Sequence, residues 1–260
     1  MGHSTDTPVV AGLPGVVLVG GGPGDPDLVT VAGRRAVELA DVLLVDHLAP
    51  AEACSWAPDD AVVIDVAKLP RGPGTTQKQI NELMVEHALA GRRVVRLKGG
   101  DGFVFGRGVE EVRACVEAGV PVQVIPGVTS ATAVPALAGI PVTHRGTVQG
   151  FSVISGHVPP GHPDSTLDYA ALAAAGTTLV VLMGVQTLPA ISGALLAAGM
   201  SPDTPAAVVA DGASPEQRAV FGTLTTIAEI AARAAITAPA VTVIGDVASL
   251  APAASSTGGH

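Results

Sequence analysis

Short runs of β-branched apolar residues alternate with amphipathic stretches through most of this 260-residue chain. An apolar run over 16–20 precedes an amphipathic stretch over 28–40, and the next apolar run follows over 42–46. Alternation of strand and helix patterns is typical of α/β folds. We therefore predict an α/β protein, with further strands over 61–66, 93–97, 122–125, 151–155, 178–183, 206–210, 219–224 and 241–244.

Amphipathic patterns predict the helices that connect these strands. They lie over 75–90, 109–118, 129–138, 169–175, 189–198 and 226–235. Thr75 and Thr76 before Gln77 and Gln79 indicate an N-cap for the first of these helices, and Gly91 indicates its C-cap.

Two of the later strands, over 206–210 and 219–224, are joined by DGASPEQR. This segment has turn-forming residues and no room for a crossover helix, so these two strands are predicted to be antiparallel. The second half of the chain is therefore expected to contain a mixed sheet.

A domain boundary is expected near the segment HRGTVQG, which interrupts the alternating pattern. We predict an N-terminal α/β domain over 16–146 and a C-terminal α/β domain with the mixed sheet over 147–248. Residues 1–15 are expected to form a flexible N-terminus. The small and polar residues of 249–260 are expected to form a disordered tail.

Charge and composition exclude several classes of protein. A net charge of −9 with 2% aromatic residues argues against nucleic-acid binding, which needs a basic surface. The apolar runs are shorter than the ~18 residues of a membrane span, and no signal-peptide pattern is evident at the start. Two cysteines, Cys54 and Cys115, cannot form a disulfide framework, so a cytoplasmic protein is expected. Cys115 fits a buried helical position.

A glycine-rich loop, GGGPGDP over 20–26, follows the first strand. A dinucleotide-binding loop is one interpretation, because Gly20 and Gly22 match its first two glycines and Asp46 ends the next strand. Asp25 stands where the third glycine should be and would repel a pyrophosphate, and two prolines remove N–H donors from the loop. A nucleoside without phosphates, such as S-adenosylmethionine, fits better. A purely structural turn remains an alternative.

Further loops follow later strands. KGGDGFVFGRG over 98–108 has glycines that allow a ligand close to the backbone, and Asp101 offers an acceptor for an amine or a hydroxyl. IPGVTS over 125–130 provides Thr129 or Ser130 as a helix cap. The strand ends near Met183 and Ala240 could form apolar walls for a purine or belong to the core.

These segments together resemble the tetrapyrrole methylases, and among them the enzymes that methylate uroporphyrinogen III. The resemblance covers roughly 16–247 and rests on VGGGPGDPDLVTVAGRRAVELADVLLVDHL, QKQINELMVEHALAGRRVVRLKGGDGFVFGRGVEE, VIPGVTSATAVPALAGIPVTHRG and LVVLMG. It implies a homodimer of two-domain α/β chains, with S-adenosylmethionine in a cleft between the domains of each chain. It also implies methylation of a small-molecule tetrapyrrole at carbons 2 and 7, giving precorrin-2 for sirohaem or cobalamin and S-adenosylhomocysteine as by-product. No metal, membrane or nucleic acid is expected.

The resemblance also implies site residues. It assigns the catalytic roles to Asp46, as proton acceptor, and to Lys68. The residues implied for cofactor binding are Pro23, Gly99, Gly100, Asp101, Val104, Thr129, Ser130, Met183, Gly212 and Ala240.

Two departures from the family pattern stand out. Gly102 replaces the usual proline after KGGD, which adds backbone freedom. The usual arginine does not directly follow Lys68, and Arg71 is a candidate to take its place.

A substrate with eight carboxylates would have to bind a protein of net charge −9 through a local basic set. The candidates for these contacts are Lys68, Arg71, Arg96, Arg107, His144 and Arg145. Solvated surface charge is the alternative for each of them. Two alternatives to methylation of uroporphyrinogen III also stay open. One is a later precorrin methyltransferase of the same fold, and the other is a regulatory protein that binds the cofactor without turnover.

Overall fold

The computed structural model describes residues 15–66 and 76–251. Within them the chain divides into two compact units between Thr129 and Ser130. This division comes earlier than the predicted boundary at 146/147, because the helix that starts at Ser130 contacts strands of the second sheet. That helix therefore belongs to the second unit.

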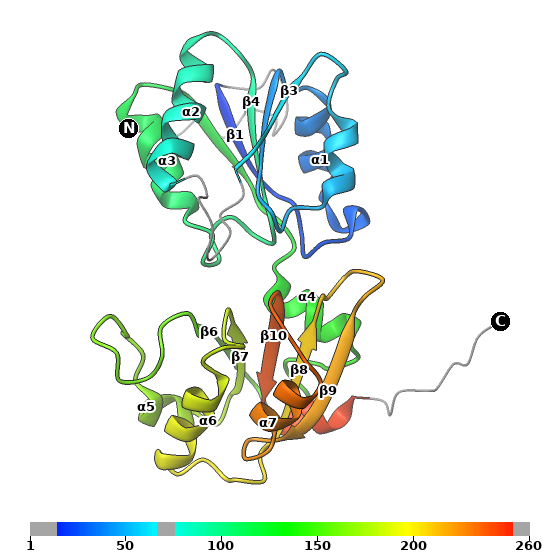
Figure 1. Ribbon diagram of the computed structural model, residues 1–260, viewed down its shortest axis with the longest axis vertical. Helices are drawn as coiled ribbons and strands as arrows, with labels where there is room; N and C mark the ends of the chain where they lie inside the picture. The colour runs from blue at the N-terminus through cyan, green and yellow to red at the C-terminus, as the bar shows by residue number, and fades with distance from the viewer. Residues whose placement is uncertain (1–14, 67–75, 252–260) are drawn as a thin grey trace, which may run out of the picture. The chain divides into compact units, whose positions relative to one another are not determined.

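The first unit is built on a five-stranded parallel sheet with the strand order β3-β2-β4-β1-β5. The strands are β1 (Val16–Gly20), β2 (Val42–Val45), β3 (Val62–Asp65), β4 (Val94–Lys98) and β5 (Val122–Ile125). The helices are α1 (Val31–Glu38), α2 (Gln77–Leu89) and α3 (Gly108–Glu117), with 3-10 turns η1 (Pro26–Leu28) and η2 (Ala51–Trp56). Figure 1 shows α1 on one face of this sheet and α2 with α3 on the other.

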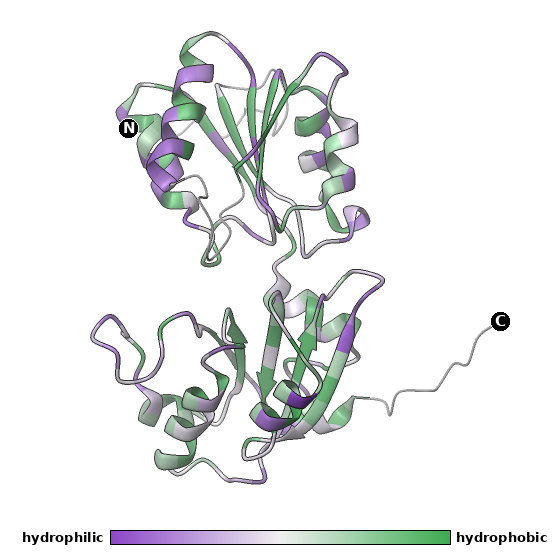
Figure 2. Ribbon diagram, viewed as in Figure 1, coloured by the Kyte–Doolittle hydropathy of each residue, from purple (hydrophilic) through white to green (hydrophobic). Residues whose placement is uncertain are grey.

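Alternation along the strands separates two apolar cores. Val17, Leu43 and Val95 pack with α1 and η2, whereas alternate residues such as Leu44 and Val94 pack with α2 and α3. Because both faces are covered, β1 and β2 consist of apolar residues and glycine, and all their residues are buried. The strands of this sheet are largely green in Figure 2.

The second unit contains a mixed sheet with the order β6-β7-β10-β8-β9. Its strands are β6 (Phe151–Ser155), β7 (Thr178–Leu182), β8 (Pro205–Ala210), β9 (Arg218–Thr223) and β10 (Ala240–Ile244). Its helices are α4 (Ser130–Leu137), α5 (Tyr169–Ala174), α6 (Leu188–Ala197), α7 (Ile227–Arg233) and the 3-10 helix η3 (Asp246–Leu250). The predicted antiparallel pairing of β8 with β9 is confirmed, and β6 with β7 is parallel.

Several local predictions can be compared with the structure. Thr76 and Gln79 form a reciprocal capping box at the start of α2, and Gly91 has a φ of +79° after its end, as expected. The single helix predicted over 28–40 is wrong at its start: η1 ends at Leu28, and α1 begins at Val31 with Thr30 as its cap.

Three further predictions concern the ends of the chain and the cysteines. Cys115 is buried, and burial raises the pKa of its thiol to about 11, as expected for an inert apolar residue. The tail predicted over 249–260 starts too early, since η3 reaches Leu250. The rest of that tail, and residues 1–14 of the predicted flexible N-terminus, lie outside the described residues. No helix within 15–66 and 76–251 is long and apolar enough to cross a membrane.

Candidate active site

Three loops of the first unit meet at one edge of its sheet. The strands are parallel, so the loops that follow β1, β4 and β5 leave the sheet at the same edge. Gly21 donates a backbone hydrogen bond to the carbonyl of Lys98 at 2.7 Å. Gly22 and Gly100 exchange a pair of backbone hydrogen bonds of 3.1 and 2.6 Å. The loops therefore form one hydrogen-bonded layer at the carboxyl edge, where α/β sheets bind ligands.

Glycines allow these loops to approach each other without side chains. A Cβ atom on Gly127 would lie 2.3 Å from the carbonyl oxygen of Gly100, and one on Gly20 would lie 2.4 Å from the nitrogen of Gly127. Gly22 and Gly100 have φ values of +77° and +61°, a region that glycine adopts readily. The glycines of the three loops thus serve first to pack backbone against backbone.

Asp101 connects two of these loops. Its Oδ1 accepts the backbone N–H of Phe103 at 2.8 Å, and its Oδ2 accepts the N–H of Gly127 at 2.9 Å. The carboxylate is half-buried and retains further lone pairs, so it can still accept a hydrogen bond from a ligand. The structure adds a loop-joining role to the ligand role predicted for Asp101.

The structure does not fit a dinucleotide site at the first loop. The β3-β2-β4-β1-β5 order differs from the 3-2-1-4-5-6 order of dinucleotide-binding sheets. No α-helix begins at the loop, because Asp25 caps the 3-10 turn η1 by accepting the N–H of Asp27 at 2.8 Å. The loop therefore lacks the helix N-terminus that would hold a pyrophosphate.

Asp46 lies at the same edge, one residue beyond β2. Leu44 and Val94 face α2 and α3, so by alternation Asp46, Arg96 and Lys98 face the same side. Arg96 Nη2 donates to Asp46 Oδ1 at 2.5 Å, and Lys98 Nζ lies 3.8 Å from Asp46 Oδ2. Asp46 is paired with buried cations and keeps 30% of its side chain exposed. Its carboxylate is therefore both ion-paired and partly open to solvent.

The buried cations meet a second carboxylate on α3. Glu111 Oε1 accepts from Arg96 Nε at 3.1 Å, and Glu111 Oε2 lies 2.9 Å from Lys98 Nζ. Arg96, Lys98 and Glu111 are 1%, 3% and 0% exposed. Burial lowers the pKa of Lys98, and the positive charge of Arg96 lowers it further, while Glu111 and Asp46 oppose this shift. We refer to Asp46, Arg96, Lys98 and Glu111 as the buried charge cluster.

The buried charge cluster corrects one prediction and reveals one omission. Arg96 is not a surface ligand for substrate carboxylates, because its guanidinium is enclosed by Asp46, Glu111 and backbone carbonyls. Sequence reasoning did not single out Lys98 or Glu111. The sequence did contain a signal for them, because Arg96 and Lys98 alternate in an otherwise apolar strand. Two cations on one face of a buried strand need an anionic partner, which a covering helix can supply.

Three predicted cofactor residues share an edge of the second sheet. Leu182 pairs with Val241 and Ala210 pairs with Ala240 in antiparallel registers, so the residues after β7 and β8 lie next to the start of β10. This brings Met183, Gly212 and Ala240 to one edge. Met183 has a φ of +57° and is 49% exposed, and a Cβ on Gly212 would lie 2.5 Å from Val134 of α4, the helix that Ser130 begins.

The other predicted residues lie at separate places. Pro23 and Val104 are half-buried in the first and second loops, and Thr129 is the last residue of the first unit. Arg107 is exposed and forms an ion pair with Glu110 at 2.6 Å. His144 and Arg145 are exposed in a turn of the second unit. In this turn the backbone N–H of His144 donates to the carbonyl oxygen of Val148 at 3.1 Å. Lys68 and Arg71 lie outside the described residues.

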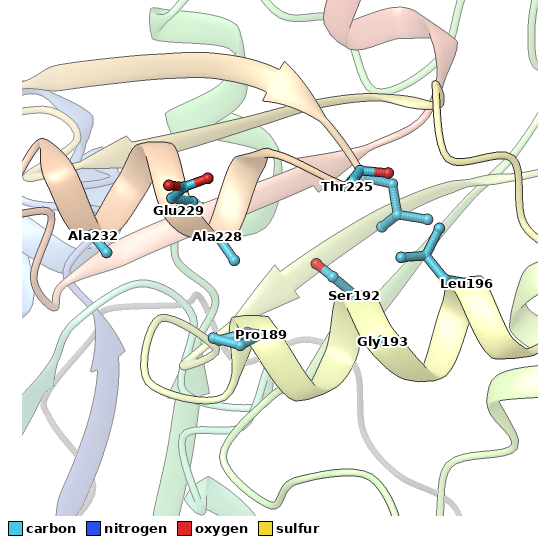
Figure 3. A pocket seen from close by; sticks show the side chains of 9 residues that line it. Pro189, Ser192, Gly193, Leu196, Thr225, Ala228, Glu229 and Ala232 are labelled. Carbon is cyan, nitrogen blue, oxygen red and sulfur yellow. The ribbon is translucent and has the colours of Figure 1, made fainter.

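A separate hollow of about 450 Å³ lies in the second unit between α6 and α7. Figure 3 shows Pro189, Ser192 and Leu196 on one wall and Ala228 and Ala232 on the other. Its walls are mainly apolar, and the Glu229 carboxylate at the hollow is paired with Arg233. The hollow contains none of the motif residues, so it is not the candidate site.

The Gly102 departure allows a test of the second loop. Gly102 is the second residue of a four-residue turn in which the backbone N–H of Val104 donates to the carbonyl oxygen of Asp101 at 3.3 Å. The φ angle of Gly102 lies outside the left-handed region. Proline is favoured at this position of a β-turn. We expect Gly102→Pro to raise the free energy of unfolding by about 0.4–1 kcal/mol, measured by denaturant titration. Gly106→Ala should lower it, because its Cβ would lie 2.7 Å from Gly102 O. Destabilisation by proline would contradict this turn geometry.

The fold, the loop segments and the sequence together define the class of protein. The chain belongs to the tetrapyrrole (corrin/porphyrin) methylases, whose family model matches residues 15–228. An S-adenosyl-L-methionine-dependent uroporphyrinogen III methyltransferase of Methanosarcina barkeri is 46% identical over 90% of this chain and 92% of its own length.

Two further relatives match over most of this chain. A siroheme synthase of Acinetobacter baylyi is 44% identical over 90% of this chain, which corresponds to 51% of that protein. The crystal structure of uroporphyrin-III C-methyl transferase from Thermus thermophilus in complex with S-adenyl homocysteine superposes with a TM-score of 0.76. It is 38% identical, and the match covers 90% of this chain and 99% of that one.

Proposed function

We propose that this protein is an S-adenosylmethionine-dependent C-methyltransferase that converts uroporphyrinogen III to precorrin-2 by methylating carbons 2 and 7. The observation that carries the proposal is the 46% identity along nearly the whole length of a methyltransferase with that substrate. The product would enter sirohaem or cobalamin synthesis.

The loop residues of the first unit fit a sulfonium nucleoside. The three-loop layer offers bare glycine backbone and the Asp101 carboxylate, which suit a cationic ligand with amine and hydroxyl groups. Met183 and Ala240 offer apolar contacts. We assign Pro23, Gly99, Gly100, Asp101, Val104 and Thr129 of the first unit, and Ser130, Met183, Gly212 and Ala240 of the second, to the cofactor.

Bound S-adenosylmethionine supplies an electrophilic methyl group. The protein must hold a pyrrole carbon in line with that methyl, and such alignment contributes much of the rate of a displacement reaction. The carbon–carbon bond forms as the sulfur–methyl bond breaks, and a proton must afterwards leave the methylated product. Asp46 is the group we assign to this proton, because its carboxylate is partly exposed and is held by Arg96. Lys68 is proposed as the second catalytic residue.

Substrate carboxylates require basic groups that are open to solvent. Arg107, His144 and Arg145 meet this condition, and we propose them as contacts together with Arg71. Bidentate pairing favours the arginines. Arg107 would first have to release or share Glu110, with which it is paired.

Titration calorimetry tests the cofactor assignment. We expect S-adenosylhomocysteine to bind and NAD to give no heat, since the first loop lacks the pyrophosphate site. Incubation with uroporphyrinogen III and labelled S-adenosylmethionine under reducing conditions should give mono- and dimethylated products. Binding of NAD alone would contradict the cofactor assignment. Binding of S-adenosylhomocysteine without methylated product would favour a regulatory protein or a later precorrin methyltransferase.

The proposed enzyme is further expected to be a cytoplasmic homodimer. The dimer follows from the resemblance to the family, and the location from the two isolated cysteines, Cys54 and Cys115. Sedimentation equilibrium of the purified protein would distinguish a dimer from a monomer.

A further inference from the structure

Glu111 is a fully buried carboxylate for which the proposed reaction has no direct use. It lies in the first turn of α3, where the helix dipole favours a negative charge. Its Oε1 accepts hydrogen bonds from Arg96 Nε and Lys98 Nζ, both at 3.1 Å, and Lys98 Nζ also lies 2.9 Å from Oε2 as an ion pair. The side-chain amide of Gln77, the first residue of α2, also donates to Oε1 at 3.2 Å. One carboxylate thus joins β4, α2 and α3.

The charges of the buried cluster balance. Arg96 and Lys98 bring two positive charges into the space under α3, and Glu111 and Asp46 bring two negative charges. Buried charges are tolerated when they are paired and hydrogen-bonded, and removal of one partner leaves another charge uncompensated. Without Glu111, both cations would have Asp46 as their remaining carboxylate in the cluster.

The members of the cluster differ in exposure. Asp46 keeps 30% of its side chain exposed, whereas Glu111 is 0% exposed and cannot touch a substrate. Arg96 lies between them: its Nε bonds to Glu111, and its Nη2 bonds to Asp46. Because the guanidinium is planar and rigid, a carboxylate fixed on its Nε side also fixes the direction of its Nη2 side.

We propose that Glu111 is a positioning residue for the methyl-transfer reaction. Glu111 holds the Arg96 guanidinium in one orientation, and Arg96 in turn holds the Asp46 carboxylate where it can receive the proton. Lys98 balances the charge of the pair and limits the movement of both carboxylates. This inference rests on the proposed function of Asp46.

Replacement of the carboxylate by an amide of the same shape tests this inference. We expect Glu111→Gln to lower kcat by ~10–100-fold, since a misplacement near 1 Å can lower a rate about 100-fold, while KM and the Kd of S-adenosylhomocysteine change by less than about threefold. Glu117→Gln is the matched control, because Glu117 is an exposed residue of the same helix. It should behave as the unsubstituted protein does. A Glu111→Gln protein with unchanged kcat would overturn the inference.

A charge-balanced pair of variants separates positioning from folding. Lys98→Met with Glu111→Gln removes one charge of each sign, so this double variant should unfold at a higher temperature than Glu111→Gln alone. Its kcat should still be ~10-fold or more below that of Lys98→Met alone, because Arg96 has lost its second anchor. Equal kcat values for these two proteins would show that Glu111 serves charge balance only, and would overturn the inference.

Nuclear magnetic resonance provides a readout that does not depend on turnover. With ¹⁵N-labelled arginine, the Arg96 Nε–H should give a signal protected from solvent exchange, and Glu111→Gln should abolish the protection. Unchanged protection would overturn the positioning role. Protected signal in an unsubstituted protein that does not methylate uroporphyrinogen III would instead contradict the proposed function, so the two failures are distinguishable.

Discussion

Replacing Asp46 with asparagine is expected to lower kcat by ~10²–10⁴-fold, the range typical of loss of a general base. The amide cannot accept a proton from the methylated ring, yet it matches the shape of the carboxylate next to Arg96. The affinity for S-adenosylhomocysteine should change much less, because Asp46 is not among the groups assigned to the cofactor. Single-turnover assays with labelled cofactor, together with calorimetry, measure the two effects separately.

The control for this variant is Asp59→Asn, the same chemical change at an exposed residue of the same unit. It should leave both turnover and affinity unchanged. Lys68→Ala is expected to resemble Asp46→Asn, with turnover impaired more than cofactor affinity. Full methylation by the Asp46 variant would remove Asp46 from the catalytic residues, whatever happens at Lys68.

Features encoded by neighbouring residues were predictable from the sequence. The short runs of β-branched apolar residues that form β1 and β2, the capping box at Thr76 and the short connection between β8 and β9 each follow from local chemistry. The position of the glycine loops at strand ends was predictable for the same reason. These loops then meet at one edge because the strands are parallel.

Features that depend on pairs distant in sequence were not predictable in this way. The boundary at Thr129 is set by contacts of α4 with β7 and β10, which no local pattern reveals. Arg96 was a candidate contact for substrate carboxylates because the sequence did not show that Glu111 and Asp46 would enclose it. The close packing of Gly20 and Gly127 against the backbones of other loops was likewise not visible in the sequence, which only placed these glycines at strand ends.

The three-loop layer gives the second large effect, because no space is left at Gly127. In Gly127→Ala the new methyl group would meet two backbones, with its Cβ 2.3 Å from Gly100 O and 2.6 Å from Gly20 C. Backbone held in a hydrogen-bonded layer cannot move as a side chain can, so we expect a loss near the upper end of the ~1–3 kcal/mol found for overpacked sites. The loops would separate, and the affinity for S-adenosylhomocysteine should fall at least ~10-fold, since ~1.4 kcal/mol corresponds to tenfold.

A graded series of alanine variants tests this explanation. Gly102→Ala should have a smaller effect, because the nearest atom to its new Cβ would be Lys98 Cδ at 3.2 Å, which belongs to a side chain and not to the backbone. Gly193→Ala, in the middle of α6 with nothing within 4 Å of the new Cβ, should instead stabilise the protein by ~0.5–1 kcal/mol without a change in affinity. Thermal unfolding and calorimetry of the three proteins give the order. If Gly127→Ala bound S-adenosylhomocysteine as well as Gly193→Ala does, close packing of the three loops would not be a requirement for cofactor binding.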